Sequence, residues 1–340
     1  MKKILCILLV FNAIACSSNT ETTPEMKFVK PANFPAPHYD LSKNPITTAG
    51  FELGRALFYE GDLSRDGSIS CGSCHQQASA FTHHGHDLSH GIDDKLGSRN
   101  APPIQNLAWH PDLFWDGGVH DLDLFSIAPI ENPLEMDEKL GNVLAKLRKN
   151  PKYPPLFNKA FGSSEISTNS FLKALSQFML MAISANSRYD KYIRKEGEIL
   201  TSEELQGLEI FKQKCATCHR GELFTDFSFR NNGLNNQFNK DLGRALITLN
   251  PEDEYKFKVP SLRNVVITAP YMHDGRFYTL NEVLNHYQNE VKNMPTLDKE
   301  LQKNNKLGIE LTSEEKQKII TFLHTLTDES FIRDRKFAEQ

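Results

Sequence analysis

Two short cysteine–histidine motifs carry the most specific chemistry in the sequence. Cys71-Gly72-Ser73-Cys74-His75 and Cys215-Ala216-Thr217-Cys218-His219 both have the pattern C-x-x-C-H, which is the attachment pattern of a c-type haem. In such a site the two thiols form thioether links to the haem vinyl groups, and the histidine that follows becomes an axial ligand of the iron. The sequence therefore predicts two covalently bound haem c groups.

Other uses of these cysteines have to be weighed against haem attachment. A C-x-x-C pair also occurs in four-cysteine zinc sites and in redox dithiols. The sequence has six cysteines. Four belong to the two motifs, Cys6 lies in the N-terminal leader, and Cys16 ends that leader. No cysteine is therefore left for a disulfide in the folded part of the chain. The repetition of the whole motif, histidine included, favours haem.

The composition is that of an ordinary globular chain. It has 340 residues, of which 39% are hydrophobic and 24% charged, and a formal net charge of −4. This length suits two modest domains. The slight acidity argues against a nucleic-acid partner and permits a basic protein partner.

The N-terminus has the form of a signal peptide, predicted to span residues 1–15. Met1-Lys2-Lys3 is followed by an apolar run that is shorter than the roughly 20 residues needed to cross a bilayer. The run ends in Ala13-Ile14-Ala15-Cys16, which resembles a bacterial lipoprotein signal. We therefore expect an exported, periplasmic protein anchored to the outer membrane through a lipid on Cys16; plain secretion with an unpaired Cys16 is the alternative. Residues 16–49, polar and proline-rich at first, are predicted to be a tether.

Apolar residues at helical spacing predict a mostly α fold. The clearest stripes are formed by Leu140, Val143, Leu144 and Leu147, by Phe171, Ala174, Leu175 and Phe178, and by Ile319, Phe322, Leu323 and Leu326. Leu200–Glu204 and Leu311–Glu315 each supply a capping hydroxyl followed by acidic residues, which predicts two helix starts. Strand patterns are weak and short.

The two halves of the sequence echo one another. Gly54–Phe58 and Gly207–Phe211 share the pattern G-x-x-x-F, and each precedes a C-x-x-C-H motif. Helices of this kind in small cytochromes c cross the C-terminal helix at a close glycine contact. After each haem motif comes an R-N pair and later a D-G pair: Arg99-Asn100 and Asp116-Gly117, then Arg263-Asn264 and Asp274-Gly275. We expect two cytochrome c-like haem domains related by duplication, at residues 50–190 and 191–340.

Further segments resemble the bacterial di-haem cytochrome c peroxidase family, which includes MauG-type enzymes that oxidise another protein. They are R-N-A-P at 99–102, F-W-D-G at 114–117, N-P-L-E-M at 132–136, V-P-S-L-R-N at 259–264 and A-P-Y-M-H-D-G-R at 269–276. The resemblance extends from about Gly50 to Asp328. It implies reduction of hydrogen peroxide with electrons from a small donor such as cytochrome c, and it is compatible with a homodimer.

The resemblance assigns the peroxidatic role to the haem held by His75. It implies that Glu135 is a general acid–base over the iron, and that His90 occupies the iron in the resting state. The spacing of His90 is longer than expected, and the alternative is that His83, His84, His86 and His90 are loop histidines facing water. Phe125 stands where the family often has a glutamine. Trp115 is implied as the electron relay between the haems.

The haem held by His219 is, by the same resemblance, the electron-transfer haem. Its other axial ligand is expected to be Tyr287, with Met294 as the alternative and a residue such as His286 as a third choice. A methionine raises the reduction potential and suits electron collection, whereas an anionic tyrosine oxygen favours the ferric state and is typical of MauG-like enzymes. The family also binds one calcium ion between the haems, which implies ligation by the Asn100 side chain and the carbonyls of Lys258 and Pro260.

These observations predict a di-haem cytochrome c peroxidase that reduces hydrogen peroxide to water. The alternative is a MauG-like enzyme that uses peroxide to oxidise residues of a protein substrate, and Tyr287 favours it. A plain electron carrier without catalysis is a third class, and Glu135 argues against it.

Overall fold

The computed structural model describes residues 25–234, 240–303 and 305–340. The predicted signal peptide and Cys16 lie outside the described residues. The α-helices of the described part are α1 (Thr48–Phe58), α2 (Cys71–Cys74), α3 (Leu122–Phe125), α4 (Ile127–Glu131), α5 (Leu140–Lys149), α6 (Tyr153–Phe161), α7 (Thr168–Met181), α8 (Arg188–Ile193), α9 (Ser202–Lys214), α10 (Ala245–Thr248), α11 (Leu280–Asn285), α12 (Ser313–His324) and α13 (Glu329–Ile332). None of the helices in these ranges is long and apolar enough to cross a membrane.

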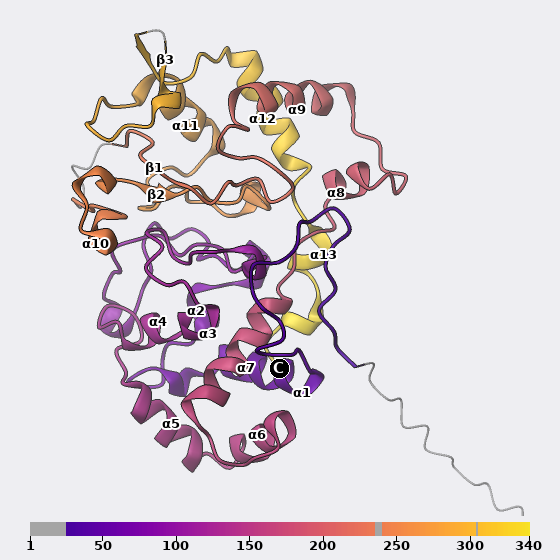
Figure 1. Ribbon diagram of the computed structural model, residues 1–340, viewed down its shortest axis with the longest axis vertical. Coiled ribbons are helices and arrows are strands. Elements are labelled where there is room, and N and C mark those ends of the chain that lie inside the picture. The colour runs from indigo at the N-terminus through magenta and orange to yellow at the C-terminus, as the bar shows by residue number, and fades with distance from the viewer. Residues whose placement is uncertain (1–24, 235–239, 304) are drawn as a thin grey trace, which may run out of the picture.

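Extended structure is sparse, so the prediction of a mostly α fold is confirmed. The antiparallel pairs are β1 (Phe229–Arg230) with β2 (Phe257–Lys258), and β3 (Gln302–Lys303) with β4 (Lys306–Leu307). Figure 1 shows β1 and β2 on the side of the upper half of the molecule that faces the lower half.

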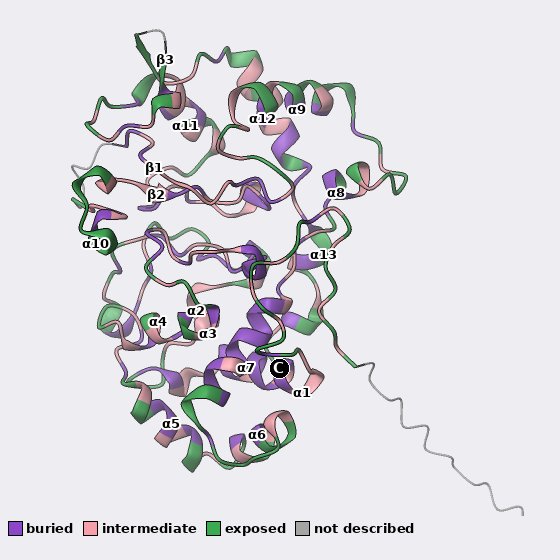
Figure 2. Ribbon diagram, viewed as in Figure 1, coloured by how far each residue is buried: buried purple, intermediate pink, exposed green. Residues whose placement is uncertain are grey.

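A hydrophobic core in the lower half is organised around α1 and α7. The predicted stripe Phe171, Ala174, Leu175 and Phe178 is buried on α7, and Figure 2 shows this helix buried over most of its length. The cap of α7 explains its start, because the Ser167 hydroxyl accepts from the Ser170 N–H. Gly54 of α1 lies directly against the backbone of Ala174, which lets the two helices cross closely.

The second core repeats this contact between α9 and α12. Gly207 of α9 lies against the backbone of Lys318, next to Phe322 of α12. Both helices begin as predicted, because Thr201 and Thr312 cap them as capping boxes with an acid in the first turn. In both halves, the glycine of the G-x-x-x-F pattern therefore allows two helices to cross in close contact.

The close contact at Gly54 predicts that a larger side chain there destabilises the fold. A Cβ at this position would collide with the Ala174 carbonyl oxygen and with Phe178, so the helices would have to separate. We expect Gly54→Ala to lower the free energy of unfolding by about 1–3 kcal/mol, the usual cost of overpacking. The matched control is Gly141→Ala in α5, where an added Cβ meets open space; it should be neutral or stabilising by up to about 1 kcal/mol. Urea unfolding measures both, and equal effects would contradict the account.

Both ends of the described chain pack on the lower half. Phe331 and Phe337 belong to its hydrophobic core, and Figure 1 shows the C-terminus beside α1 and α7. Residues 25–47 contain no helix or strand, but Phe28 and Phe34 pack against Trp109 at 5.7 and 5.0 Å between ring centroids. This part of the predicted tether is therefore attached to the protein body, because Phe34 is buried there and Phe28 is half-buried.

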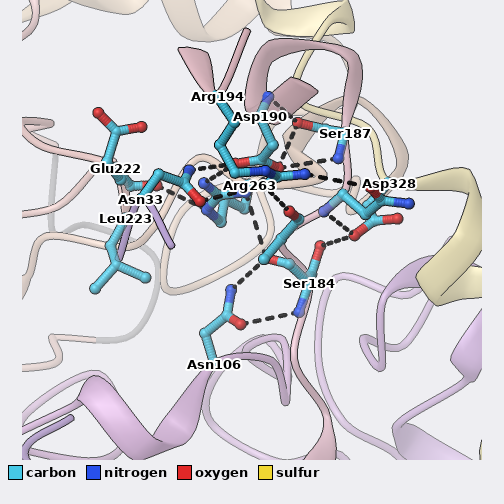
Figure 3. A network of polar contacts seen from close by, with 12 residues as sticks. Asn33, Asn106, Ser184, Ser187, Asp190, Arg194, Glu222, Leu223, Arg263 and Asp328 are labelled. Carbon is cyan, nitrogen blue, oxygen red and sulfur yellow. Dashed lines mark hydrogen bonds and ion pairs between the residues drawn. The ribbon is translucent and has the colours of Figure 1, made fainter. Parts of the chain in front are cut away.

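A buried polar network joins these segments (Figure 3). The guanidinium of Arg263 makes a two-pronged ion pair with Asp190 at 2.7 and 2.8 Å, and both side chains are fully buried. Asn33 of the N-terminal segment donates to Asp190, and Ser184 donates to Asp328 near the C-terminus. Burial raises the pKa of Asp190, but the hydrogen bonds and charge of Arg263 outweigh it and hold that pKa below its usual range. The network thus fixes the linker between the two cores.

Candidate haem sites and the peroxidatic pocket

The first C-x-x-C-H motif forms the short helix α2. Cys71 and Cys74 lie at its two ends, and the His75 N–H bonds to the Cys71 carbonyl at 2.9 Å. The His75 Nδ1 donates to the Phe81 carbonyl at 2.7 Å, which leaves Nε2 for a metal. Burial lowers the pKa of His75 to about 4, so the ring is neutral near pH 7, as an iron ligand has to be.

The second motif has the same local geometry at the end of α9. The His219 N–H bonds to the Cys215 carbonyl at 3.0 Å, and its Nδ1 donates to the Phe224 carbonyl at 3.1 Å. Burial also lowers the pKa of His219. Both histidines are therefore oriented by a backbone carbonyl five or six positions later in the chain, with Nε2 available.

The four motif cysteines are free thiols. Burial raises the pKa of Cys71 and Cys215 to about 12, and that of Cys74 and Cys218 to about 11. Such thiols are protonated near neutral pH. In the described ranges, no group of three or more His, Cys, Asp or Glu side chains is arranged to hold a metal ion. Each motif holds two thiols and one histidine within five consecutive residues, which is the arrangement that thioether attachment of haem requires.

A cavity of about 1100 Å³ opens beside the second motif. Cys215, Cys218 and His219 line it, together with apolar residues from α9, α11 and α12. Asn100 and Trp115 of the first half form part of its wall. The cavity is large, mostly apolar and supplied with the attachment residues on one side, which suits a haem group.

Tyr287 lines this cavity, and Met294 is not among its lining residues. The two side chains are nevertheless neighbours, because both pack against the small cluster of Val291, Leu297 and Leu301. Tyr287 lies in the π-helical turn His286–Glu290 that continues α11; such turns are frequent at functional sites. Burial raises the pKa of Tyr287 to about 12. Of the two ligands considered from sequence, Tyr287 is the one that lines the cavity, and the identity of the ligand stays a prediction.

His286, the third choice, has a different partner. Its Nε2 donates to the Asn232 carbonyl at 3.0 Å, and the ring is buried against Phe277 at 5.6 Å between centroids. This hydrogen bond holds the imidazole in a structural role.

Glu135 lies beside the first motif. It acts electrostatically on both Cys71 and Cys74, and its Oε1 accepts from the Asn132 side chain at 3.0 Å. Burial raises the pKa of Glu135, and the Asn132 hydrogen bond partly offsets this. The turn Asn132–Glu135 thus presents a partly desolvated carboxyl next to the position where the first haem would attach.

The histidine loop lies against the turn that carries Glu135. The Ile92 N–H donates to the Glu135 carbonyl at 2.8 Å, and the Cys74 thiol contacts the His90 carbonyl at 3.5 Å. The His90 ring bonds to His86 at 3.1 Å between Nε2 and Nδ1. His86 is exposed and stacks on the buried His83, so the alternative of four water-facing histidines does not hold for His83. Whether His90 binds the resting iron stays a prediction.

Phe125 has a structural explanation. Its ring stacks on Phe114 at 4.6 Å between centroids, directly before Trp115 in the chain. An apolar side chain here packs the turn that carries the tryptophan, in place of the polar glutamine that the resemblance leads one to expect.

Trp115 connects the two halves through backbone contacts. Its indole N–H donates to the Asn100 carbonyl at 2.9 Å, and its own carbonyl accepts from the Lys258 N–H at 2.7 Å. The ring lies on the wall of the second cavity, which suits the predicted relay.

The three residues predicted to bind calcium also line this cavity. The Asn100 side chain donates to the carbonyls of His86 and Asp87, both at 3.1 Å, and the Lys258 ammonium donates to the Asp112 carbonyl at 2.6 Å. Burial lowers the pKa of Lys258 to about 8. The residues are therefore brought together, and calcium binding itself stays a prediction.

The structure changes the register of the predicted internal repeat. Asn106 and Asn264 both have left-handed backbones, with φ of 57° and 59°, and each begins a short 3₁₀-helix. Each also stands the same distance before its D-G pair. In local backbone geometry and in its distance from the D-G pair, Asn264 therefore matches Asn106 more closely than it matches Asn100. The left-handed backbone at both positions favours asparagine.

Asn232 and Met272 are two cavity residues that were not predicted from the sequence as site residues. Asn232 donates to the Met272 sulfur at 3.4 Å, and both residues line the cavity together with Tyr287. Asn231-Asn232-Gly233 has the composition of an ordinary turn, and no spacing rule connects it with Tyr287.

Comparison with known proteins agrees with this geometry. Residues 48–198 match the family model described as di-haem cytochrome c peroxidase. The methylamine utilization protein MauG of Methylophilus methylotrophus is 33% identical over 95% of this chain and 93% of its own length. The chain belongs to the di-haem cytochrome c peroxidase family.

Family members with different names are equally similar to this chain. The cytochrome c551 peroxidase of Nitrosomonas europaea is 34% identical over 81% of the chain and 79% of its own length. A solved structure of a MauG-like protein associated with microbial copper homeostasis has a TM-score of 0.81 and 33% identity, and the match covers 92% of this chain and 99% of that one. Membership of the family is consistent with haem cofactors and peroxidase chemistry. It does not distinguish a MauG-like enzyme from a cytochrome c peroxidase, because both are similar to this chain to the same degree.

Proposed function

We propose that this di-haem peroxidase is MauG-like, and that it uses hydrogen peroxide to oxidise residues of a protein substrate. The observation that carries the proposal is that Tyr287 lines the second haem cavity, whereas the neighbouring Met294 does not. A tyrosine oxygen favours the oxidised states of a haem and makes it a poor collector of electrons from a mild donor.

Different residues of the chain bind the haems, transfer the proton and transfer the electrons. Bound haems would supply redox-active iron. His75 and His219 would hold the iron atoms through Nε2, and the motif cysteines would fix the haems in place. Glu135 would take the proton from one peroxide oxygen and deliver it to the other, so that water can leave. Trp115, on the wall of the cavity beside the second motif, would carry electrons from the second half to the first.

Reduction of peroxide with a small electron donor such as cytochrome c is the second candidate. The similarity to the cytochrome c551 peroxidase of Nitrosomonas europaea favours it, and Glu135 serves it equally well. The candidates differ in where the electrons originate: a protein side chain in the first, a soluble donor in the second.

Peroxide-dependent oxidation of a reduced small cytochrome c by the haem-loaded protein separates the candidates. For the MauG-like enzyme we expect negligible turnover, while peroxide still changes the spectra of both haems. Turnover of about 1 to 1,000 per second, as is usual for enzymes, would overturn the proposal in favour of the cytochrome c peroxidase.

Four finer features belong to the same proposal. The paired glycine contacts at Gly54 and Gly207 support a duplicated two-domain origin, with the predicted boundary near residue 190. Export and lipid attachment at Cys16 rest on the N-terminal sequence, and mass spectrometry of the mature N-terminus tests them. Calcium rests on the family resemblance, and metal analysis of the purified protein tests it. A homodimer rests on the resemblance alone, and sedimentation tests it.

A further inference from the structure

The guanidinium of Arg99 bridges two carboxylates that come from different halves of the chain. Its Nη1 donates to Asp116 Oδ2 at 2.5 Å, and its Nε and Nη2 donate to the two oxygens of Asp241 at 2.6 and 2.9 Å. The three side chains are 18%, 12% and 7% exposed, so salt screens these ion pairs only weakly. The planar fork of an arginine can hold both carboxylates at once, and a lysine ammonium lacks this geometry.

Arg99 is connected to Trp115 through two neighbouring residues. Asp116 directly follows the tryptophan, and its Oδ1 accepts from the Gly118 N–H at 2.9 Å, which fixes the carboxylate at the turn after the ring. Asn100 directly follows the arginine, and its carbonyl accepts from the Trp115 indole N–H at 2.9 Å. The guanidinium is therefore joined to the indole by two routes, through Asp116 and through Asn100.

The second half of the chain holds the other side of this arrangement. The Arg99 guanidinium lies over the Phe257 ring of β2, 5.6 Å from its centroid, and this ring stacks on His273 at 3.7 Å. The Asn100 N–H donates to the His273 carbonyl at 2.8 Å. Phe257, His273 and Trp115 all line the cavity beside the second motif, and β2 lies on the side of the upper half that faces the lower half (Figure 1). The ion pairs of Arg99 thus lie at the junction of the two halves.

We propose that Arg99 is a positioning residue for electron transfer between the two halves: by pairing with Asp116 and Asp241, it holds the indole of the relay in a fixed place at the junction. This inference rests on the proposed function, in which Trp115 carries the electrons. Arg99 itself gains and loses no electron, and it acts only through the position of the ring. A reacting group has to be held within about 0.5 Å of its productive position by the residues around it.

The first variant to test is Arg99→Leu in the haem-loaded protein. After peroxide is added, the second haem should change oxidation state about 10- to 100-fold more slowly than in the wild type, because a displacement of about 1 Å at a reacting group can cost this much. The reaction of peroxide at the first haem should keep its wild-type rate, since neither Glu135 nor its hydrogen-bond partner Asn132 belongs to these ion pairs.

Asp241→Asn is a milder change at the same contact, and it serves as the test if Arg99→Leu does not fold. The amide oxygen can still accept from the Gly243 N–H, as Asp241 Oδ1 does at 2.9 Å, and the Arg99–Asp116 pair stays in place. The ion pair to the second half is lost. The transfer should slow by a smaller factor, and a wild-type rate in this variant overturns the inference.

The hydrogen bond of the indole gives a readout that does not depend on turnover. The chain has two tryptophans, so in a Trp109→Phe background the indole N–H band in ultraviolet resonance Raman spectra comes from Trp115. Adding Arg99→Leu should shift this band toward that of a weaker hydrogen bond. An unchanged band would show that the ring keeps its place without the guanidinium, and it would overturn the inference.

Arg188→Leu is the matched control. Arg188 of α8 also bridges two carboxylates, because it donates to Glu198 at 2.8 Å and to Glu204 at 2.5 Å. Its loss should lower the stability to urea and leave the indole band and the transfer rate at their wild-type values. An equal slowing of the transfer in this variant would overturn the specific role of Arg99.

A Trp115→Phe background separates failure of this inference from failure of the relay. If Trp115→Phe alone leaves the transfer at the wild-type rate, the relay and the inference are both overturned. If Trp115→Phe slows the transfer and Arg99→Leu does not, the relay stands and only the role of Arg99 is overturned. The double variant should be no slower than Trp115→Phe alone, and a further loss as large as in the wild-type background would contradict action through the ring.

Discussion

Replacing Glu135 by glutamine is expected to lower the rate of peroxide reaction by about 10²–10⁴-fold, the usual contribution of a general acid–base. Glutamine keeps the shape of the side chain, and its amide oxygen can still accept from Asn132, as the Glu135 Oε1 does at 3.0 Å. It cannot take a proton from peroxide and return it. Stopped-flow spectra of the haem-loaded variant mixed with peroxide measure the effect.

The pH dependence gives this prediction a second readout. Burial raises the pKa of Glu135, against a smaller opposing effect of Asn132. The carboxylate form is the one that accepts the peroxide proton, so the wild-type rate should fall as the pH drops through this raised pKa. Glutamine does not titrate, and the acid limb should be absent from the profile of the variant.

The effect on stability should have the opposite sign. A carboxyl whose pKa is higher in the folded than in the unfolded protein destabilises the fold once the pH exceeds its unfolded value. Removing that charge should therefore leave stability at neutral pH unchanged or slightly higher. Glu131→Gln in α4 is the control: the Glu131 Oε1 accepts from the Leu140 N–H at 3.1 Å, which an amide oxygen can also do, and the peroxide reaction should keep its wild-type rate. A variant of Glu135 that reacts at the wild-type rate would remove the residue from the mechanism.

The haem motifs and the helices that carry them were predictable because their signals are local. Cysteine and histidine spacing within five residues fixes which atoms can reach one haem, and the apolar stripe of α7 needs only helical periodicity. The capping boxes at Thr201 and Thr312 are read directly from four consecutive residues. These features depend little on the rest of the chain.

The remaining features depend on contacts between distant segments. Asn232 and Tyr287 line the same cavity only because the chain returns through the π-helical turn, and neither residue type predicts the other. The left-handed backbone that Asn106 shares with Asn264 cannot be read from the letters, whereas the R-N pair at residues 99–100 can. Likewise, Phe28 and Phe34 are two aromatic residues in a proline-rich stretch, and only the surface offered by Trp109 determines that they pack.

The two tryptophans provide a matched pair for testing electron relay. Trp115 and Trp109 each donate an indole N–H to a backbone carbonyl at 2.9 Å, to Asn100 and Pro35 respectively. Trp115 lies on the wall of the haem cavity, whereas Trp109 is 3% exposed in the hydrophobic core. Phenylalanine at either position removes one hydrogen bond and retains an aromatic ring, so the structural loss is similar in the two variants, about 1 kcal/mol for the bond.

Their functional effects should differ sharply. An indole is oxidised far more easily than a benzene ring, so Trp115→Phe should remove most of the electron transfer between the halves while peroxide still reaches the first haem. Trp109→Phe should lose stability and keep the transfer rate. The measurement is the rate at which the second haem changes oxidation state after peroxide is added, with urea unfolding of both variants as the structural reference. Equal transfer rates in the two variants would show that electrons cross without the Trp115 ring, through the backbone contacts that join Trp115 to Asn100 and Lys258.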